Sequence, residues 1–289
     1  MIVVTGATGQ LGRLVIEELL KTTDAENIIA AVRTPEKAKG FADRGLQVRE
    51  ADYARPETLP TAFDGASRLL LISGNDLGKR EEQHKDVIDA AKAAGVSFVA
   101  YTSILHCDTS PVLLAAEHLA TERYLLSSGL AYSLLRNGWY YENQTAAITQ
   151  AVQNGAFIGA SGDGRFAAAS RSDYAIAAAR VLTRENHENT VLELGGDQPY
   201  TRAELAAEVS RQTGKVTGYN NLSEMEYKKV LSSFLPDALA AVVADAEACA
   251  AQGALDDSSR TLSRLLGRPT TSLAEAVESA LRTPPASHS

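Results

Sequence analysis

The chain has 289 residues, of which 45% are hydrophobic and 22% are charged. This length and balance are those of a globular protein that can bury a sizeable core. Asp and Glu outnumber Lys and Arg by 36 to 28, which gives a net charge of −8 at pH 7. Without a basic stripe, this charge argues against a surface that binds nucleic acid. No apolar run approaches the length that crosses a membrane, so we expect no membrane segment.

The cysteines and the start of the chain bear on its compartment. The first apolar run begins at residue 2, which leaves no room for a signal peptide, and we expect a cytoplasmic protein. Cys107 and Cys249 lie far apart and in no C-x-x-C or metal-ligand spacing. We therefore expect two free thiols, no disulfide framework and no bound metal.

A strand, a glycine-rich turn and a helix open the chain. Residues 2–5 form a short β-branched run that is typical of a buried parallel strand. Gly6, Gly9 and Gly12 follow in a G-x-x-G-x-x-G pattern, and apolar residues at helical spacing begin with Leu11. Glycines at these positions allow a tight turn, a close approach to a pyrophosphate, and close packing of helix on strand. The amide groups that begin the helix favour a bound phosphate.

The glycine pattern predicts a loop that holds the pyrophosphate of a dinucleotide. Its residues are Gly6, Ala7, Thr8, Gly9, Gln10 and Leu11. The loop contains no lysine, which excludes a P-loop. A glycine-rich turn could serve the fold alone, but the strand before it and the helix after it favour nucleotide binding.

The second strand, residues 28–32, ends at Arg33. A site specific for NAD has Asp or Glu at this position to hold the ribose 2′-hydroxyl, whereas an arginine accommodates a 2′-phosphate. Arg33 therefore indicates NADPH as the cofactor. The alternative is an ordinary surface arginine at the end of a strand.

Strands and helices then alternate up to residue 136. Apolar β-type runs cover residues 48–51, 68–72, 97–101 and 132–136, and helical spacing covers residues 79–94 and 112–129. This alternation predicts an α/β fold with a Rossmann-like doubly wound parallel sheet. The segment from Asn137 to Asn143 breaks the pattern at the same sheet edge as the glycine turn, where it could cover the reactive end of a cofactor.

Beyond residue 150 the elements become shorter and mixed. Strands are expected at residues 157–158 and 191–194, and helices at residues 172–182 and 236–251. Thr201 with Glu204, and Ser223 with Glu226, are capping-box signatures that predict two further helix starts. We expect an NADP-binding Rossmann domain at residues 1–150 and a smaller mixed α/β lobe at residues 151–289. The boundary is approximate, and the segments could interleave.

Three segments together resemble one protein family. They are Val4–Gly12, Tyr101–Ser103 and Leu134–Tyr140. These segments are similar to the NmrA-like atypical short-chain dehydrogenases/reductases, and within that family to bacterial NAD(P)H:quinone oxidoreductases. Reductases of triphenylmethane dyes share many of them, and the likeness covers nearly the whole chain.

The resemblance implies an oxidoreductase that passes a hydride from NADPH directly to a quinone, in a cleft between two lobes. It implies neither flavin nor metal. The expected partner is a small-molecule quinone, with no nucleic acid and no membrane, and a homodimer is left open.

The resemblance also implies further residues along the cofactor. Carried over by position, they are Asp52, Ser73, Asn137, Gly138, Trp139, Tyr140, Asn143 and Arg171. Asp52 falls where the superfamily contacts adenine, although it could equally cap a turn or a helix. Trp139 and Tyr140 could border the quinone or, equally, fill a core.

The Tyr-x-x-x-Lys pair of ordinary short-chain dehydrogenases is absent, because Leu105 and Ser128 stand four residues after Tyr101 and Tyr124. Where relatives keep a catalytic lysine, this chain has His118. A histidine donates a proton near neutral pH, which suits an oxygen that gains negative charge. The alternative is a surface or capping histidine on a helix.

Some NmrA-like proteins bind a dinucleotide without turnover and regulate a partner, and the missing Tyr-Lys pair also fits such a redox sensor. Quinones need little acid catalysis, so the missing pair does not exclude an enzyme. We predict an NADPH:quinone oxidoreductase, with a sensor or a reductase of triphenylmethane-type dyes as alternatives.

Overall fold

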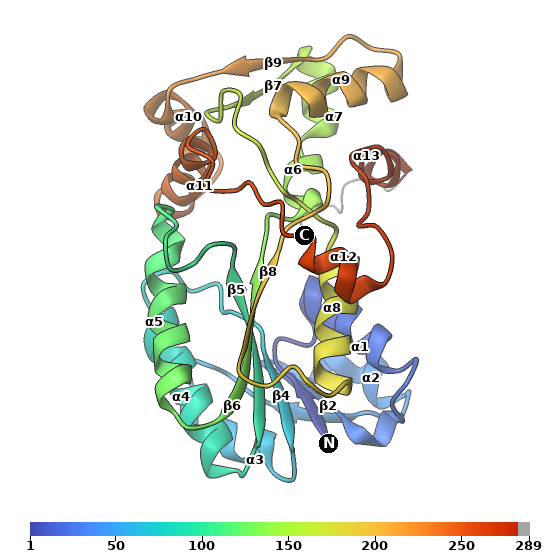
Figure 1. Cartoon of the computed structure of the whole chain (residues 1–289), viewed down its shortest axis with the longest axis vertical. Coiled ribbons are helices and arrows are strands. Elements are labelled where there is room, and N and C mark those ends of the chain that lie inside the picture. The colour runs from blue at the N-terminus through green and yellow to red at the C-terminus, as the bar shows by residue number, and fades with distance from the viewer. Residues whose placement is uncertain (283–289) are drawn as a thin grey trace. The chain divides into compact units, whose positions relative to one another are not determined.

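The computed structural model describes residues 1–282 and divides into two compact units (Figure 1). Unit 1 consists of Met1–Asp108, Ala116–Asn137 and Tyr174–Leu192. Unit 2 consists of Thr109–Ala115, Gly138–Asp173 and the described residues from Glu193 onward. The chain therefore passes between the units several times, whereas the sequence analysis places one approximate boundary at residue 150.

Unit 1 is built on a seven-stranded sheet. Its strands are β1 (Ile2–Val4), β2 (Ile28–Val32), β3 (Gln47–Glu50), β4 (Arg68–Leu71), β5 (Phe98–Ile104), β6 (Ala131–Asn137) and β8 (Thr190–Leu194), in the order β3-β2-β1-β4-β5-β6-β8. Each neighbouring pair from β3 to β6 is parallel. The order reverses at β1, which is the point where parallel sheets of this type bind dinucleotides. The predicted Rossmann-like sheet is thus confirmed.

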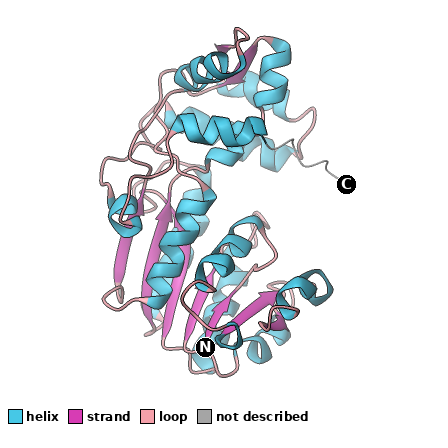
Figure 2. Cartoon of the chain, turned by 90° about the vertical axis from the view of Figure 1, so that its right-hand side faces the viewer, coloured by secondary structure: helices cyan, strands magenta, loops and turns pink. Residues whose placement is uncertain are grey.

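Helices cover both faces of this sheet (Figures 1 and 2). One face carries α3 (Leu59–Phe63), α4 (Arg80–Ala93) and α5 (Leu113–Ser127), and the other carries α1 (Gln10–Leu19), α2 (Lys39–Ala42) and α8 (Arg171–Thr183). Phe63 and Val87 pack with Leu69 and Val99 of the sheet in a fully buried core. Both faces of the strands are apolar because both are covered, which explains their continuous hydrophobic runs.

Unit 2 combines a small sheet with short helices. Strands β7 (Ala156–Gly159) and β9 (Gly218–Asn221) pair in parallel. The helices are α6 (Tyr141–Thr145), α7 (Ile148–Asn154), α9 (Arg202–Thr213), α10 (Glu224–Leu231), α11 (Asp237–Ala250), α12 (Thr261–Leu266) and α13 (Leu273–Arg282). Helices α9 and α10 begin with the predicted capping boxes, in which each N-cap hydroxyl and each third-residue carboxylate accepts a backbone N–H bond.

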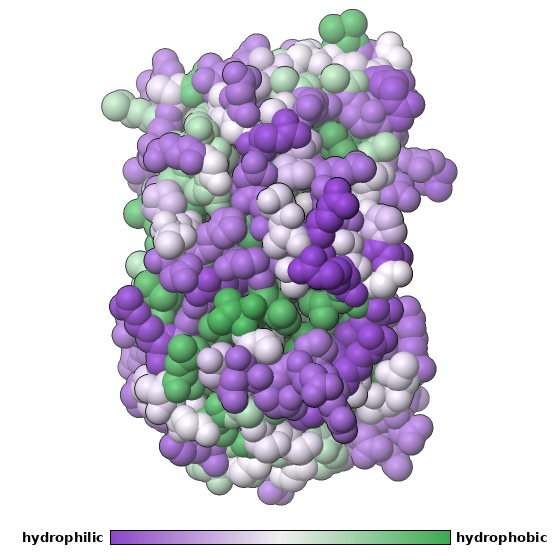
Figure 3. All heavy atoms as spheres, viewed as in Figure 1, coloured by the Kyte–Doolittle hydropathy of each residue, from purple (hydrophilic) through white to green (hydrophobic). Residues whose placement is uncertain are grey.

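Hydrophilic side chains cover much of the face seen in Figure 3, as the charged fraction of the chain leads one to expect. Within residues 1–282, no helix combines the length and the apolar character that crossing a membrane requires.

Glycine is required at two positions of the turn between β1 and α1. Gly6 has φ of +58°, a left-handed conformation that side chains with a Cβ rarely adopt. A Cβ on Gly12 would lie against the Gly6 carbonyl oxygen and only 2.8 Å from the Ala7 Cα. Gly12 therefore lets α1 pack directly on the turn.

We predict that Gly12→Ala lowers the free energy of unfolding by about 1–3 kcal/mol, because the added methyl group forces backbone apart. The matched control is Gly40→Ala, since nothing lies within 4 Å of a Cβ at Gly40. That control should be neutral or slightly stabilising. Urea unfolding of both variants is the measurement, and equal midpoints for the two would contradict the packing argument.

A histidine lies inside the core of unit 1. His84 of α4 is fully buried and meets the ring of Tyr101 edge-on, with 5.4 Å between ring centroids. Burial, aided by the nearby Arg80 guanidinium, lowers the pKa of His84 to about 3. His84 is therefore neutral in the folded protein at neutral pH.

The pKa of His84 predicts acid sensitivity. In the pH range between the ordinary pKa of 6.5 and about 3, His84 binds a proton in the unfolded chain but not in the folded chain. The free energy of unfolding is therefore unaffected by His84 protonation above pH 6.5. It falls as the pH is lowered toward 3, by at most about 1.4 kcal/mol per pH unit from this residue.

His84→Gln removes this titration, so the difference in unfolding free energy between native chain and variant should shrink as the pH is lowered from 6.5. Urea unfolding at intervals from pH 7.5 to 4.5 measures it. A constant difference across that range would show that His84 does not titrate in this way.

Candidate functional site

The carboxyl ends of β1 to β4 are tied together by hydrogen bonds. The Ala7 N–H donates to the Ala31 carbonyl at 3.3 Å, which joins the glycine turn to β2. The Ala51 N–H donates to the Val32 carbonyl at 2.8 Å, which joins β2 to the end of β3. The unit 1 segments that carry the glycine turn, Arg33 and Asp52 thus meet along one edge of the sheet.

Thr5, directly before the glycine turn, is the centre of a second set of bonds. Its buried hydroxyl donates to the Leu70 carbonyl at 2.9 Å and accepts the Ile72 N–H at 3.0 Å. The Tyr53 hydroxyl lies 2.5 Å from the same oxygen and 2.9 Å from the Ile72 carbonyl. One threonine oxygen therefore connects the ends of β1 and β4 with the segment after β3.

The glycine turn is shaped to receive an anion. The Gly9 N–H closes the turn on the Gly6 carbonyl at 2.9 Å, and Arg13 holds the Thr8 carbonyl through Nε at 2.8 Å. The first amide groups of α1 have no acceptor within their own helix. Its first turn contains no acidic side chain, so nothing on the helix competes for those amides. This cradle fits a pyrophosphate.

Arg33 follows β2 at this sheet edge, and its side chain is exposed. In the part of the chain that the structure describes, its guanidinium has neither a hydrogen-bond acceptor nor an ion-pair partner. An unpaired arginine next to a phosphate cradle can bind a 2′-phosphate without first breaking another contact.

The Asp52 carboxylate is bound by residues of its own turn. It accepts the Ala54 N–H at 3.0 Å and lies 3.4 Å from Nε of Arg55. This is the capping role left open by the sequence, and contact with adenine stays a prediction. Ser73 is half-buried just after β4, and its N–H donates to the Thr102 hydroxyl at 2.9 Å.

His118 of α5 is buried with 3% of its surface exposed. Its Nδ1 lies 2.7 Å from the hydroxyl of Tyr101, which is itself fully buried. Burial lowers the pKa of His118 well below its ordinary value, and the nearby Arg80 and His84 act in the same direction. The residue is therefore a neutral, hydrogen-bonded histidine within unit 1, and its catalytic role stays a prediction.

Several predicted residues of unit 2 contact one another. Arg171 donates to the Asn143 side-chain oxygen at 2.5 Å, and its guanidinium carbon lies 5.0 Å from the centre of the Tyr140 ring. The Glu142 carboxylate accepts the Arg171 N–H at 2.9 Å. Trp139 is half-buried and packs against the core of this unit.

Two further predicted residues mark the end of β6. Asn137 is its last residue, and its carbonyl accepts the Leu105 N–H at 3.0 Å. The Gly138 N–H donates to the Leu194 carbonyl at 3.0 Å. Because α6 begins at Tyr141, the irregular stretch predicted for residues 137–143 is limited to residues 138–140.

Sequence reasoning gave no role to Thr5, Tyr53 or Arg13, although all three shape the loops of unit 1. A hydroxyl residue between a buried strand and a glycine turn is the one signal that could have singled out Thr5. The partners of Tyr53 are 48 and 19 residues away, so no local pattern indicates them.

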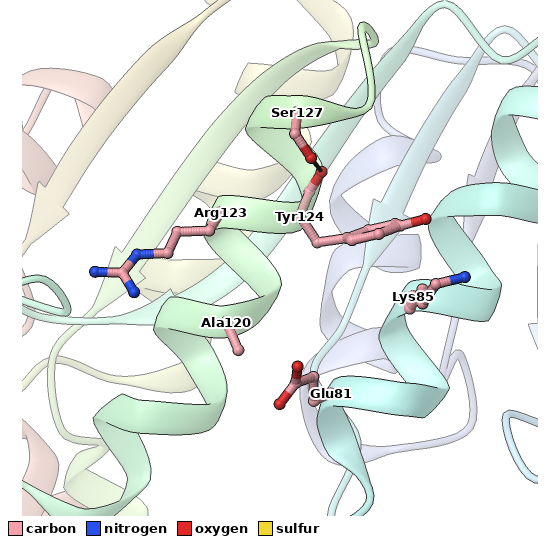
Figure 4. Close-up of a pocket in the computed structure, with 6 residues that line it drawn as sticks. All are labelled: Glu81, Lys85, Ala120, Arg123, Tyr124 and Ser127. Atoms are coloured by element: carbon pink, nitrogen blue, oxygen red, sulfur yellow. Dashed lines mark hydrogen bonds between the residues drawn. The ribbon is translucent and has the colours of Figure 1, made fainter.

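A groove of about 400 Å³ lies on the surface between α4 and α5 (Figure 4). It is lined by Glu81, Lys85, Ala120, Arg123, Tyr124 and Ser127. None of the predicted site residues lines it. Among residues 1–282, no three His, Cys, Asp or Glu side chains are grouped so that they could hold a metal ion.

Comparison with known proteins adds to this geometry. Residues 6–185 match the family described as NAD(P)H-binding. The chain is 54% identical to quinone oxidoreductase 2 of Escherichia coli over 278 residues, which are 96% of this chain and 97% of that protein.

Two solved structures are similar over nearly the full chain. The NADPH-dependent quinone oxidoreductase of Escherichia coli, crystallised with NADPH, has a TM-score of 0.95 and 52% identity and covers 97% of this chain and 100% of its own. The triphenylmethane reductase of Citrobacter sp. with NADP(H) has a TM-score of 0.93 and 39% identity, with the same coverage. The chain therefore belongs to the NAD(P)H-binding family, as an NmrA-like atypical short-chain dehydrogenase/reductase.

Proposed function

We propose that the chain is an NADPH:quinone oxidoreductase that reduces quinones by two electrons through direct hydride transfer. The observation that carries the proposal is the 54% identity to quinone oxidoreductase 2 of Escherichia coli over 96% of the chain. The glycine cradle and the unpaired Arg33 support the cofactor half of the proposal independently.

The residues present fit NADPH. The amides of Thr8, Gln10 and Leu11 would bind the pyrophosphate, because they lie at the positive end of the α1 helix dipole. The Gly9 N–H is already bonded to the Gly6 carbonyl, and Gly9 would instead allow the close approach of the backbone to the pyrophosphate. Arg33 would bind the 2′-phosphate, and Ser73 would lie beside the cofactor at the end of β4. When bound, NADPH supplies the hydride, and the protein contributes binding, orientation and exclusion of water.

Reduction of a quinone to a hydroquinone takes up one proton with each hydride. His118 is neutral and its Nδ1 faces Tyr101, so we assign no proton-donating step to an imidazolium at this position. In unit 2, Arg171 orients Asn143 and stacks on Tyr140, which keeps the loop after β6 in one conformation.

Two other functions are alternatives to quinone reduction. A reductase of triphenylmethane-type dyes is supported by the 39% identity to the Citrobacter enzyme. A sensor that binds NADP(H) without turnover is supported by the missing Tyr-x-x-x-Lys pair.

The experiment follows NADPH oxidation by absorbance against quinones, triphenylmethane dyes, aldehydes and no acceptor. We expect turnover with quinones well above the rate without acceptor. Faster turnover with dyes than with quinones would make dyes the preferred substrate class. Tight NADPH binding without turnover of any acceptor would favour the sensor.

We also propose a cytoplasmic location, supported by two buried cysteines that are not joined in a disulfide. Cell fractionation tests it. Whether the chain forms a homodimer is tested by light scattering of the purified protein.

We predict that NADPH binds about tenfold to a hundredfold more tightly than NADH, because Arg33 adds charge-assisted hydrogen bonds to the 2′-phosphate. Arg33→Asp should abolish or reverse this preference. Arg123→Asp, an exposed arginine of α5, is the matched control and should retain it. Fluorescence titration of both nucleotides measures the effect, and unchanged NADPH affinity in Arg33→Asp would remove Arg33 from the site.

We predict that Trp139 borders the quinone, where an aromatic ring offers stacking and excludes water. Trp139→Ala should raise the quinone KM about tenfold and leave NADPH affinity within about twofold. Val152→Ala is the control, because Val152 also packs half-buried against the same core. Similar kinetics in both variants would make Trp139 a core residue only.

A further inference from the structure

The loop between β4 and α4 is held by side chains from two helices. At its start, both backbone groups of Gly74 are bound from α4. The Gly74 N–H donates to His84 Nε2 at 2.9 Å, and the Gly74 carbonyl accepts from Arg80 Nε at 2.9 Å. A Cβ at Gly74 would lie 3.3 Å from a side-chain oxygen of Gln83, so the backbone fits closely against the helix.

A carboxylate of α5 holds the other end of the loop. Glu117 Oε1 accepts the Gly78 N–H at 2.7 Å, and Glu117 Oε2 pairs with Arg80 Nη1 at 2.8 Å. The Arg80 side chain is 6% exposed and that of Glu117 is 21% exposed. An ion pair this far removed from water depends on both partners, because loss of one leaves the other poorly compensated.

The hydrogen bonds fix which nitrogen of His84 carries the proton. Nε2 accepts from Gly74, so the proton is on Nδ1, which donates to the Thr121 hydroxyl at 3.0 Å. Thr121 in turn donates to the Glu117 carbonyl at 3.0 Å. The acceptor that Gly74 requires is therefore held in place by α5.

The loop that these side chains hold begins beside the glycine turn. Ile72 is bonded to Thr5, and its side chain lies 3.8 Å from the position of a Cβ on Gly6. Ser73 stands between Ile72 and Gly74. Displacement of Gly74 would therefore move Ser73 relative to the glycine turn.

We propose that Arg80, His84 and Glu117 are positioning residues that hold the Ser73–Gly78 loop in the conformation that binds NADPH. The three side chains act through the loop backbone, so that NADPH meets a surface that is already ordered. The proposal rests on the proposed NADPH-dependent reduction. We expect quinone binding to change much less than NADPH binding, because the bonds to the loop are made at Gly74 and Gly78.

The test compares two replacements of His84, one without and one with a hydrogen-bond acceptor. His84→Phe keeps a ring and loses the acceptor for the Gly74 N–H, whereas His84→Gln can restore an acceptor through its amide oxygen. We expect His84→Phe to raise the NADPH Kd and the NADPH KM about tenfold, with the quinone KM within about twofold. His84→Gln should recover most of the NADPH affinity.

Glu117→Ala is the second variant, in case His84→Phe does not fold. It frees both the Gly78 N–H and Arg80, and the NADPH KM should rise in the same way. Glu81→Gln is the matched control, since Glu81 follows Arg80 on α4 and points into the groove of Figure 4. It should leave all constants unchanged.

Folded variants with unchanged NADPH Kd would overturn the proposal. So would equal changes in kcat and both KM values, or failure of His84→Gln to recover affinity, since these indicate a general structural role. The NADPH Kd comes from fluorescence titration without acceptor. It therefore tests these residues even if the native chain proves to have no quinone reductase activity.

Discussion

The hydroxyl group of Thr5 is the contact on which the cofactor edge of unit 1 depends. It is buried, it joins β1 to β4 through Leu70 and Ile72, and it receives Tyr53 from the segment after β3. Burying a hydroxyl is favourable only when its hydrogen bonds are made, so these three segments are ordered together. The glycine turn begins at the next residue, so these segments also fix the position of the turn.

Local sequence patterns were sufficient for most of the fold. The β-branched run at residues 2–5 and the alternation after it led to the correct parallel sheet, because a sheet covered on both faces needs continuous apolar strands. The Thr201 and Ser223 capping boxes marked two helix starts correctly. The passage of residues 109–115 into unit 2 and 174–192 into unit 1 could not be read this way, since contacts between distant segments decide it.

The residues of the candidate site likewise fall into those that local patterns indicate and those that contacts between distant segments decide. The conformational roles of Gly6 and Gly12 could be identified because they follow from the backbone of a tight turn. The role of Arg33 follows from its charge at the end of a strand, and it stays a prediction. The sequence left His118 open between a proton donor and a surface or capping residue. Neither its burial nor its contact with Tyr101 could be predicted, because both depend on the packing of α5 against β5. Helix α4 likewise contributes His84 to a loop ten residues earlier in the chain.

We propose that this chain itself brings NADPH and a quinone together for direct hydride transfer. The most direct test is a single turnover of enzyme-bound NADPH with excess quinone, using NADPH deuterated at each face of the nicotinamide C4 in turn. We expect protein free of flavin to oxidise the bound NADPH completely, and deuterium at one face only to slow the reaction. Absence of oxidation, or equal rates with all three forms of NADPH, would contradict the proposal.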